Sequence, residues 1–312
     1  MRVAWMVPQG ESLNWSSSLR LRRLDIASYL GKSGLVAEAR VFREYTGKSL
    51  LEMLNILRDF DVVLFAEQSE YDHKLMTMLR SMPNRPVLLR DHCENLWGFP
   101  LEQECFMLAD SVVCSSTLLQ RISADKGVPQ PYTIEEHFEE VPLDGNPWDK
   151  PLVAGYMGTD GLLADQIRAW ASTAGWQVQI LCRPENGIAG SIEWQEGTWQ
   201  EYFRNFRVLL APQRVDHYPA KSPAKVVQGL GNGLPVVASN LPAYVDNVRH
   251  GVDGVICQTE SEWKKAFSVL ADNHTMRYLS ENATQSPIRQ SHSLDSIARQ
   301  WLAHFTRLRL SI

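Results

Sequence analysis

Short apolar runs alternate with longer amphipathic stretches along this chain, and this alternation limits the possible folds more than any other property of the sequence. Residues 3–7, 61–66 and 208–211 are short and largely apolar, whereas residues 17–32 carry apolar side chains at helical spacing. Such an alternation is typical of βα units. In these units the strands form a parallel sheet with helices on both faces. We therefore expect an α/β fold.

The alternation stops once and then restarts. Residues 139–148 contain two prolines, a glycine and polar neighbours without a clear period, a composition typical of a linker. Strand-length runs precede it at residues 3–7, 36–42, 61–66, 87–90, 111–114 and 132–135, and follow it at 152–156, 177–181, 191–194, 208–211, 235–238 and 255–257. We predict Rossmann-like parallel-sheet domains over residues 1–145 and 149–290, with a final helix in residues 291–312.

Composition and charge exclude several classes of protein. The 312 residues carry a formal net charge of −5, whereas a dedicated nucleic-acid-binding protein usually has a basic surplus. No apolar run approaches the roughly 18 residues of a membrane helix, and the N-terminal run is too short for a signal peptide. Five widely spaced cysteines without a Cys-x-x-Cys pattern indicate reduced thiols. We expect a cytoplasmic protein that does not bind nucleic acid.

Residues 222–239 form the most specific motif of the chain. Ser222 and Pro223 suit the N-cap and first position of a helix, and Gly233 suits the end of that helix. Lys225 lies in the first turn, where the helix dipole disfavours a cation. A cation in this place favours an anionic ligand nearby; the alternative is an ordinary helix with a surface lysine.

The same segment resembles the carboxyl-domain signature of the retaining glycosyltransferase family 4, also called glycosyl transferases group 1, which includes sucrose synthase and bacterial mannosyltransferases. The family pattern reads roughly Pro-x-Lys-x-x-Glu-Ala-Met-Ala-x-Gly-x-Pro-Val-Val-Ala-Ser, followed by Glu-x-Val-x-x-Gly-x-x-Gly. The matching residues are Pro223, Lys225, Gly233, Pro235, Val236, Val237, Ala238, Ser239, Val248, Gly251 and Gly254.

The resemblance implies a GT-B fold, in which two Rossmann-like domains face a cleft and a C-terminal helix returns to the first domain. In that fold the second domain binds a nucleoside-diphosphate sugar and the first domain binds the acceptor. Carried onto this chain, the resemblance implies that Ser222 and Lys225 lie at the diphosphate, and that Gln228 occupies the place of a ribose-binding residue.

Two positions depart from the family pattern. Gln228 stands where the family has a Glu, and Ala220 stands where many members have an acid near the donor sugar. A carboxylate accepts hydrogen bonds from both hydroxyls of a ribose, whereas an amide accepts with one end only. Asp216, His217 and Tyr218 are alternative polar groups in the same loop. If Gln228 lies over the ribose, we expect Gln228→Glu to bind nucleotide at least as tightly.

Two further stretches are candidates for a phosphate site. Gly158 and Thr159 lie in a turn after the strand run 152–156, where glycine allows a close backbone approach and the N–H groups of the next helix favour an anion. Arg183 and Arg214 each follow a strand run, and arginine binds phosphate in a bidentate manner. The alternatives are a tight turn that requires glycine and solvated loop arginines.

Asp91, His92, Cys93 and Glu94 follow the strand run 87–90. Loops after parallel strands line the ligand sites of open α/β sheets, and ionisable groups in such a loop favour acid–base chemistry. We therefore predict that the acceptor hydroxyl lies near His92 and that His92 is catalytic. The alternative is a hydrogen-bonded loop without a catalytic role.

Together these observations predict a hexosyltransferase-like enzyme that transfers a sugar from a nucleoside-diphosphate sugar to a hydroxyl of a saccharide or another acceptor. Lys225 and Arg183 would stabilise the charge on the departing phosphate. The eight histidines show no metal-binding spacing, so we expect no metal and no cofactor besides the nucleotide sugar. The alternatives are a non-catalytic GT-B-like subunit that binds a nucleotide or a protein partner, and a sugar-nucleotide epimerase. The sequence leaves a peripheral membrane or protein partner open.

Overall fold

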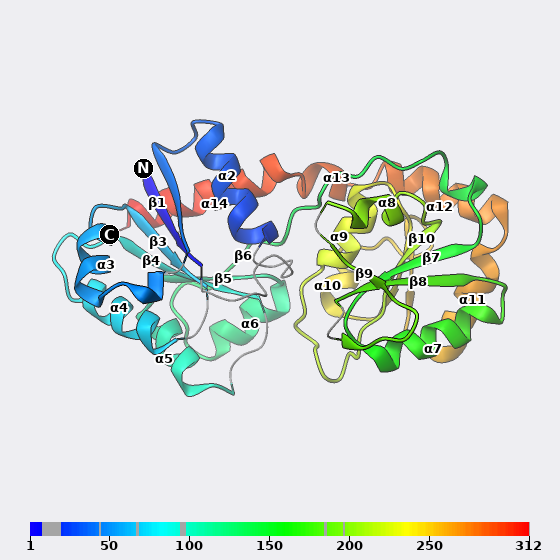
Figure 1. The fold of residues 1–312 in the computed structure, drawn as a ribbon, viewed down its shortest axis with the longest axis horizontal. Helices are drawn as coiled ribbons and strands as arrows, with labels where there is room; N and C mark the ends of the chain where they lie inside the picture. The colour runs from blue at the N-terminus through cyan, green and yellow to red at the C-terminus, as the bar shows by residue number, and fades with distance from the viewer. Residues whose placement is uncertain are drawn as a thin grey trace. The chain divides into compact units, whose positions relative to one another are not determined.

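The structure is a computed structural model that describes residues 1–7, 20–43, 45–66, 69–93, 98–183, 186–195 and 197–311. The chain divides into two compact units (Figure 1). Unit 1 comprises Met1–Glu136, Ala220–Ser222 and Leu294–Ile312, and unit 2 comprises His137–Pro219 and Pro223–Ser293. Each unit is therefore assembled from segments that are separate in the sequence.

Unit 1 is built on a parallel sheet in the order β2-β1-β3-β4-β5-β6. Its strands are β1 (Arg2–Met6), β2 (Glu38–Phe42), β3 (Val62–Phe65), β4 (Val87–His92), β5 (Ser111–Cys114) and β6 (Tyr132–Thr133). Strands β1 and β2 pair in register from Arg2 with Glu38 to Met6 with Phe42. The expected α/β class is confirmed for this half of the chain.

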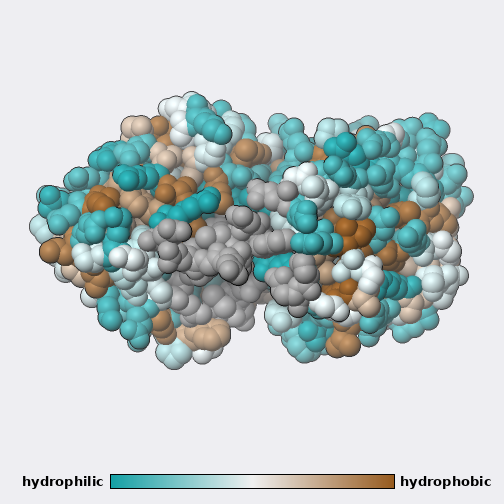
Figure 2. Space-filling view, viewed as in Figure 1, coloured by the Kyte–Doolittle hydropathy of each residue, from teal (hydrophilic) through white to brown (hydrophobic). Residues whose placement is uncertain are grey.

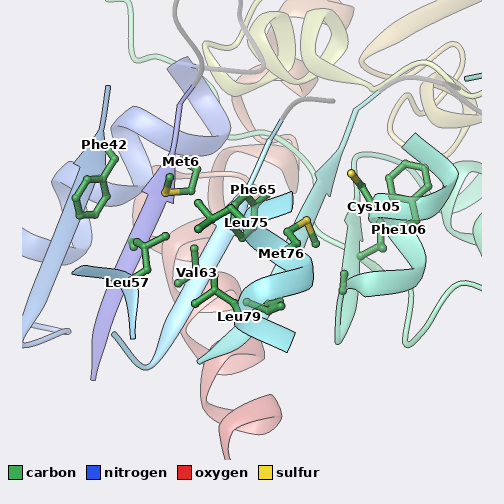
Figure 3. Packing of buried hydrophobic residues seen from close by; sticks show 14 of the residues in the cluster. Met6, Phe42, Leu57, Val63, Phe65, Leu75, Met76, Leu79, Cys105 and Phe106 are labelled. Carbon is green, nitrogen blue, oxygen red and sulfur yellow. The ribbon is translucent and has the colours of Figure 1, made fainter. Parts of the chain in front are cut away.

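Both faces of the unit 1 sheet are buried, as β3 illustrates. Val63 and Phe65 belong to the core on one face, shown in Figure 3, whereas Val62 and Leu64 belong to the core on the other face. A strand that is buried on both faces needs a continuous apolar sequence rather than an alternating one. This requirement explains why the strand could be recognised as an uninterrupted apolar run.

Helices cover both faces of this sheet. The core of Figure 3 receives side chains from α3 (Leu50–Leu57), α4 (Glu70–Arg80), α5 (Pro100–Leu108) and α6 (Thr117–Asp125). The other core receives side chains from α2 (Asp25–Lys32) and α14 (Leu294–Arg309). Ser49, Ser69 and Ser116 cap α3, α4 and α6, because each hydroxyl accepts a backbone N–H of the first turn.

Helix α14 completes the second core of unit 1. Ile297, Trp301 and Phe305 are buried there, and the ring of Phe305 lies 6.0 Å from that of Trp5 in β1, measured between centroids. The side chain of His304 contacts the Ser111 hydroxyl of β5 at 3.1 Å. The last helix of the chain is therefore part of the fold of unit 1.

Unit 2 is built on a second parallel sheet, in the order β12-β11-β10-β7-β8-β9. Its strands are β7 (Val153–Met157), β8 (Gln177–Cys182), β9 (Ile192–Glu193), β10 (Val208–Ala211), β11 (Val236–Ser239) and β12 (Gly254–Cys257). Its helices are α7 (Gly161–Ser172), α8 (Trp199–Phe203), α9 (Ala224–Gly231), α10 (Pro242–Val245), α11 (Glu260–Leu270), α12 (Asn273–Thr284) and α13 (Ile288–Ser291). Leu209 and Leu210 of β10 enter cores on opposite faces.

One strand is longer than the sequence predicted. The apolar run 87–90 suggested that Asp91 and His92 lie in a loop, but β4 continues through both residues. They stay in the sheet because β5 pairs with them: Asp91 is opposite Val113 and His92 is opposite Cys114. Residues 17–19 of the first predicted helix, and Glu94 of the predicted acceptor loop, lie outside the described residues.

The surface shows no large apolar area on the face drawn in Figure 2, where the hydrophobic patches outside the grey atoms are separated by hydrophilic residues. Among the described residues, none of the helices combines the length and apolar character needed to cross a membrane. All five cysteines are described by the structure, and all are free thiols.

Candidate active site

The order of strands in unit 2 indicates where a ligand would bind. From β7 the chain proceeds to β8 and β9 on one side, whereas β10, β11 and β12 lie on the other side. The strand order therefore reverses between β7 and β10, which are paired neighbours. In open α/β sheets ligands bind at the carboxyl ends of the strands beside such a switch point. A ligand is thus expected to bind at the loops after β7 and β10.

An ion pair joins these two loops. Asp160 follows β7 and Arg214 follows β10, and the Nε atom of Arg214 lies 2.8 Å from the Oδ2 atom of Asp160. Asp160 is also the N-cap of α7, because its carboxylate accepts the backbone N–H of Leu163 at 3.2 Å. The helix start predicted to bind an anion therefore already carries a carboxylate of the protein.

Gly158 is required by a neighbouring side chain. A Cβ atom at this position would lie 2.2 Å from the ring of Tyr156, which is buried beneath the turn. Burial raises the pKa of the Tyr156 hydroxyl to about 12, and this hydroxyl forms a hydrogen bond with the Asp160 backbone. Thr159 is exposed in the same turn. Local packing therefore accounts for the glycine, and the role of Gly158 and Thr159 at a diphosphate stays a prediction.

Lys225 lies close to the same turn. It occupies the first turn of α9, as predicted, and its Nζ atom lies 6.0 Å from the centroid of the Tyr156 ring. An ammonium over the face of an aromatic ring is attracted by the ring's quadrupole. Helix α9 therefore brings a cation to the switch point of the sheet.

Arg183 adds a third cationic residue at this edge. It directly follows β8, which pairs with β7 on the side away from β10. Since the strands are parallel, Arg183, Arg214 and Lys225 all lie at or near the carboxyl edge of one sheet. Residues 184 and 185 lie outside the described residues. Among the described residues, this edge of unit 2 thus carries three cationic side chains, of which Arg214 is paired with Asp160.

The structure assigns Ser222 and Ala220 to unit 1. Ala220 is 2% exposed and belongs to the same apolar core of unit 1 as Val63 and Phe65, and its carbonyl accepts the hydroxyl of Ser116 at 3.1 Å. Ser222 forms a side-chain hydrogen bond with Glu136. An acid at position 220 would lie in that apolar core, so the local fold suits the alanine. The placement of Ser222 at a diphosphate stays a prediction.

Gln228 makes two hydrogen bonds to the backbone of Glu139. Its Oε1 atom accepts the Glu139 N–H at 2.9 Å, and its Nε2 atom donates to the Glu139 carbonyl at 2.8 Å. The side chain is buried. The amide is thus engaged at both ends, a contact that the sequence did not predict.

His92, the predicted acceptor-site base, is buried in unit 1. Its ring packs edge-on against Phe106, with the centroids 4.5 Å apart. Burial lowers the pKa of His92 to about 3, and the nearby Arg90 contributes in the same direction. A base with so low a pKa accepts a proton poorly at neutral pH. The geometry therefore gives no support to a catalytic role of His92, which stays a prediction.

A buried charge network lies beside His92 in unit 1. Asp91 contacts Arg22 at 2.7 Å and Arg23 at 3.1 Å, both from the short π-helical segment η2 (Arg20–Leu24). Burial acts to raise the pKa of Asp91, but the two guanidinium groups hold it below its ordinary value. Glu136 lies 4.0 Å from Arg22, and burial raises the pKa of this carboxyl.

Sequence reasoning missed the two arginines of this network. They lie in a stretch that reads as an amphipathic basic helix, and nothing local indicates that they are buried. Their partner is 69 positions away along the chain from Arg22, so only the folded sheet reveals the pairing. Within the described residues no group of three or more His, Cys, Asp or Glu side chains is arranged to hold a metal ion.

Two Rossmann-like parallel sheets, with the final helix completing the first unit, define the GT-B fold, and comparison with solved structures confirms this class. No protein-family model matches the chain, and no curated protein matches it by sequence. The evidence from known proteins is therefore structural.

Three solved structures illustrate the similarity. HepE from Anabaena, in complex with UDP and glucose, matches with a TM-score of 0.71 and 13% identity, covering 98% of this chain and 100% of that chain. Sucrose-phosphate synthase from Thermosynechococcus elongatus matches with a TM-score of 0.71 and 12% identity over 100% of both chains. The apo form of the lipopolysaccharide outer core galactosyltransferase WaaB matches with a TM-score of 0.67 and 14% identity, covering 98% of this chain and 100% of that chain.

Proposed function

We propose that the protein is a glycosyltransferase that transfers a sugar from a nucleoside-diphosphate sugar to an acceptor hydroxyl. The similar structures include HepE with UDP-glucose and the galactosyltransferase WaaB. The signature around Lys225 supports a relationship to the retaining glycosyltransferase family 4. The alternative of a non-catalytic subunit rests on the departures at positions 220 and 228 and on the burial of His92.

One observation carries this proposal: three cationic residues follow or adjoin the carboxyl ends of the strands at one edge of the unit 2 sheet, and one of them, Arg214, is paired with Asp160. Arg183 follows β8, Arg214 follows β10 and Lys225 opens α9. A nucleoside diphosphate is an anion whose two phosphates need several cationic or N–H partners. This edge of the sheet therefore suits a nucleotide-sugar donor, which is a ligand class of GT-B enzymes.

The chemistry of transfer assigns a role to these cations. The bond between the sugar and the diphosphate breaks, and negative charge develops on the departing phosphate oxygen. Preorganised positive groups stabilise that charge most effectively where water is excluded. We assign this role to Lys225 and Arg183, with Gly158, Thr159 and Ser222 as further donor contacts. The acceptor hydroxyl is assigned to unit 1, in which His92 lies.

The proposal is tested by binding and turnover with defined nucleotides. Calorimetric titration with UDP, GDP and ADP should show one that binds, and Lys225→Ala should weaken its binding about tenfold or more, because a charge-assisted contact is worth about 1.5–3 kcal/mol. Lys265→Ala, which removes an exposed lysine of α11, is the matched control and should bind like the parent. Transfer of labelled sugar from the matching nucleotide sugar to acceptors of a cell extract tests catalysis. A parent protein that binds none of the nucleotides would refute the proposal.

A further inference from the structure

Gln228 of helix α9 and Asn232, the C-cap residue of that helix, both contact one backbone segment through their side-chain amides. Gln228 and Asn232 are four positions apart, so they lie on the same face of the helix end. Besides the two contacts of Gln228 with Glu139, the Nδ2 atom of Asn232 donates to the Glu139 carbonyl at 2.9 Å. The Oδ1 atom of Asn232 accepts the Val141 N–H at 2.6 Å. In these four contacts the donors and acceptors of the segment Glu139–Val141 belong to its backbone.

These contacts require amides rather than carboxylates. Each amide accepts one backbone N–H of this segment and donates to the Glu139 carbonyl, and Asn232 donates to the carbonyl of Gln228 as well, at 2.8 Å. An ionised carboxylate accepts but does not donate. A Glu at position 228 would therefore place a negatively charged carboxylate oxygen against the Glu139 carbonyl oxygen, whereas the Gln donates a hydrogen bond to it. The sequence departure at position 228 is thus explained by the local fold.

A glycine allows the same segment to approach the helix closely. Phe138, which precedes Glu139, packs its ring against Gly231 of α9 and is buried in a core of unit 2. A Cβ atom on Gly231 would lie 2.2 Å from that ring. Helix α9 therefore contacts the segment through Gln228, Gly231 and Asn232 together, and the chain enters unit 2 along this contact.

We propose that Gln228 and Asn232 form an amide clamp that fixes residues 138–141 on α9. In this proposal Gln228 is a positioning residue and does not hydrogen-bond the ribose of the donor. The part that concerns the ribose rests on the proposed nucleotide binding. The clamp itself rests only on contacts within unit 2. It removes the premise, that Gln228 lies over the ribose, on which we expected Gln228→Glu to bind nucleotide at least as tightly.

Whether Gln228 binds the ribose is tested by measuring dissociation constants for whichever of UDP, GDP and ADP binds, and for the 2′-deoxy form of the same nucleotide. The ratio of the two dissociation constants should be the same in the parent, in Gln228→Ala and in Asn232→Ala. Asn232→Ala is the matched control, since it removes the other half of the clamp. If Gln228 binds the ribose, the ratio falls toward one in Gln228→Ala alone, and this result would overturn the proposal.

The clamp is tested without any ligand by comparing Gln228→Glu with the parent in urea unfolding. At pH 7 the variant should unfold at a lower urea concentration. The deficit relative to the parent should shrink as the pH falls toward 5, because a protonated Glu donates to the Glu139 carbonyl and accepts its N–H as the amide does. Equal stability of variant and parent at pH 7 would overturn the clamp. A parent that binds no nucleotide would refute the proposed function but leave this comparison decisive.

Discussion

At the scale of single residues, Gly158 shows how packing and function compete to explain one glycine. The sequence suggested that its backbone approaches a phosphate, and the structure places the Tyr156 ring where a side chain would be. The two explanations are separable by substitution, since one concerns the fold and the other concerns a ligand.

We expect Gly158→Ala to destabilise unit 2 by about 1–3 kcal/mol, the usual range for overpacking a filled site. The added Cβ would lie 2.2 Å from the Tyr156 ring, which must shift. Gly161→Ala is the matched control, because its Cβ would meet only Ile188 at 3.7 Å. Urea unfolding of both variants checks the prediction. Similar midpoints for Gly158→Ala and the parent would show that the turn has room and that the glycine has another reason.

The residues of the candidate site were predictable to different degrees. Lys225 and Gly233 were recognised because they belong to a motif whose spacing is local, and both lie where the motif places them. The role of Gln228 was not predictable, because its partner Glu139 is 89 positions away. The burial of His92 escaped detection for the same reason, since it depends on β5 and on Phe106.

At the scale of the elements, the buried strands were the most predictable part. Strand β3 is a continuous apolar sequence because both of its faces are covered. The end of β4 was not predictable, since Asp91 and His92 are polar residues that only pairing with β5 keeps in the sheet. Sequence periodicity reports which side chains are buried, whereas strand ends depend on neighbours.

Helix α14 gives unit 1 a specific sensitivity to acid. His304 is buried between Ser111, Tyr132 and Arg307, with its ring stacked on Tyr132 at 4.5 Å. Burial lowers the pKa of His304 from 6.5 to about 4, and Arg307 adds to the shift. Between these values the unfolded chain binds a proton that the folded state does not bind. The contribution of His304 to the unfolding free energy is therefore fully present above pH 6.5 and is lost as the pH falls toward 4.

We expect His304→Gln to reduce this acid sensitivity. The full shift corresponds to about 3 kcal/mol of unfolding free energy at 1.36 kcal/mol per pKa unit. Between pH 7 and pH 4.5 the free energy of urea unfolding should therefore fall less in the variant than in the parent. His274→Gln, which alters an exposed histidine of α12, should behave like the parent. Parallel pH profiles for all three proteins would contradict the assignment to His304.

At the scale of the whole molecule, the two parallel sheets followed from the interrupted alternation of strands and helices. That alternation did not predict that each unit is assembled from segments separate in the sequence. Residues Ala220–Ser222 belong to unit 1 although the sequence around them continues in unit 2. Periodicity is a local property of the sequence, and it carries no information about which distant sheet a short loop joins.

Removing α14 should unfold unit 1. A chain that ends at Ser293 lacks Ile297, Trp301, Phe305 and Leu308, all buried in the second core. Burying each such side chain contributes about 1.5–3 kcal/mol, so the sum is comparable with the roughly 5–15 kcal/mol that stabilises a domain. Limited proteolysis should cleave residues 20–136 rapidly and leave unit 2 protected.

A chain that ends at Arg309 is the control for this truncation. It keeps the buried residues of α14 and removes Leu310, which is 86% exposed. It should resist the protease like the full chain. If the chain ending at Ser293 resists equally well, then α14 is not needed for the core of unit 1.

The assembly of unit 1 from distant segments fixes the order of events on the ribosome. Strands β1 and β3 are translated early, yet Val3, Trp5 and Leu64 have no covering helix α14 until residues 294–309 emerge from the exit tunnel. All of unit 2 is translated before that helix. Domains usually complete in the order of synthesis, from the N-terminus onward. In this protein the unit whose translation begins first receives its last helix only after all of unit 2 has been translated, so we expect its apolar face to stay uncovered by α14 until then.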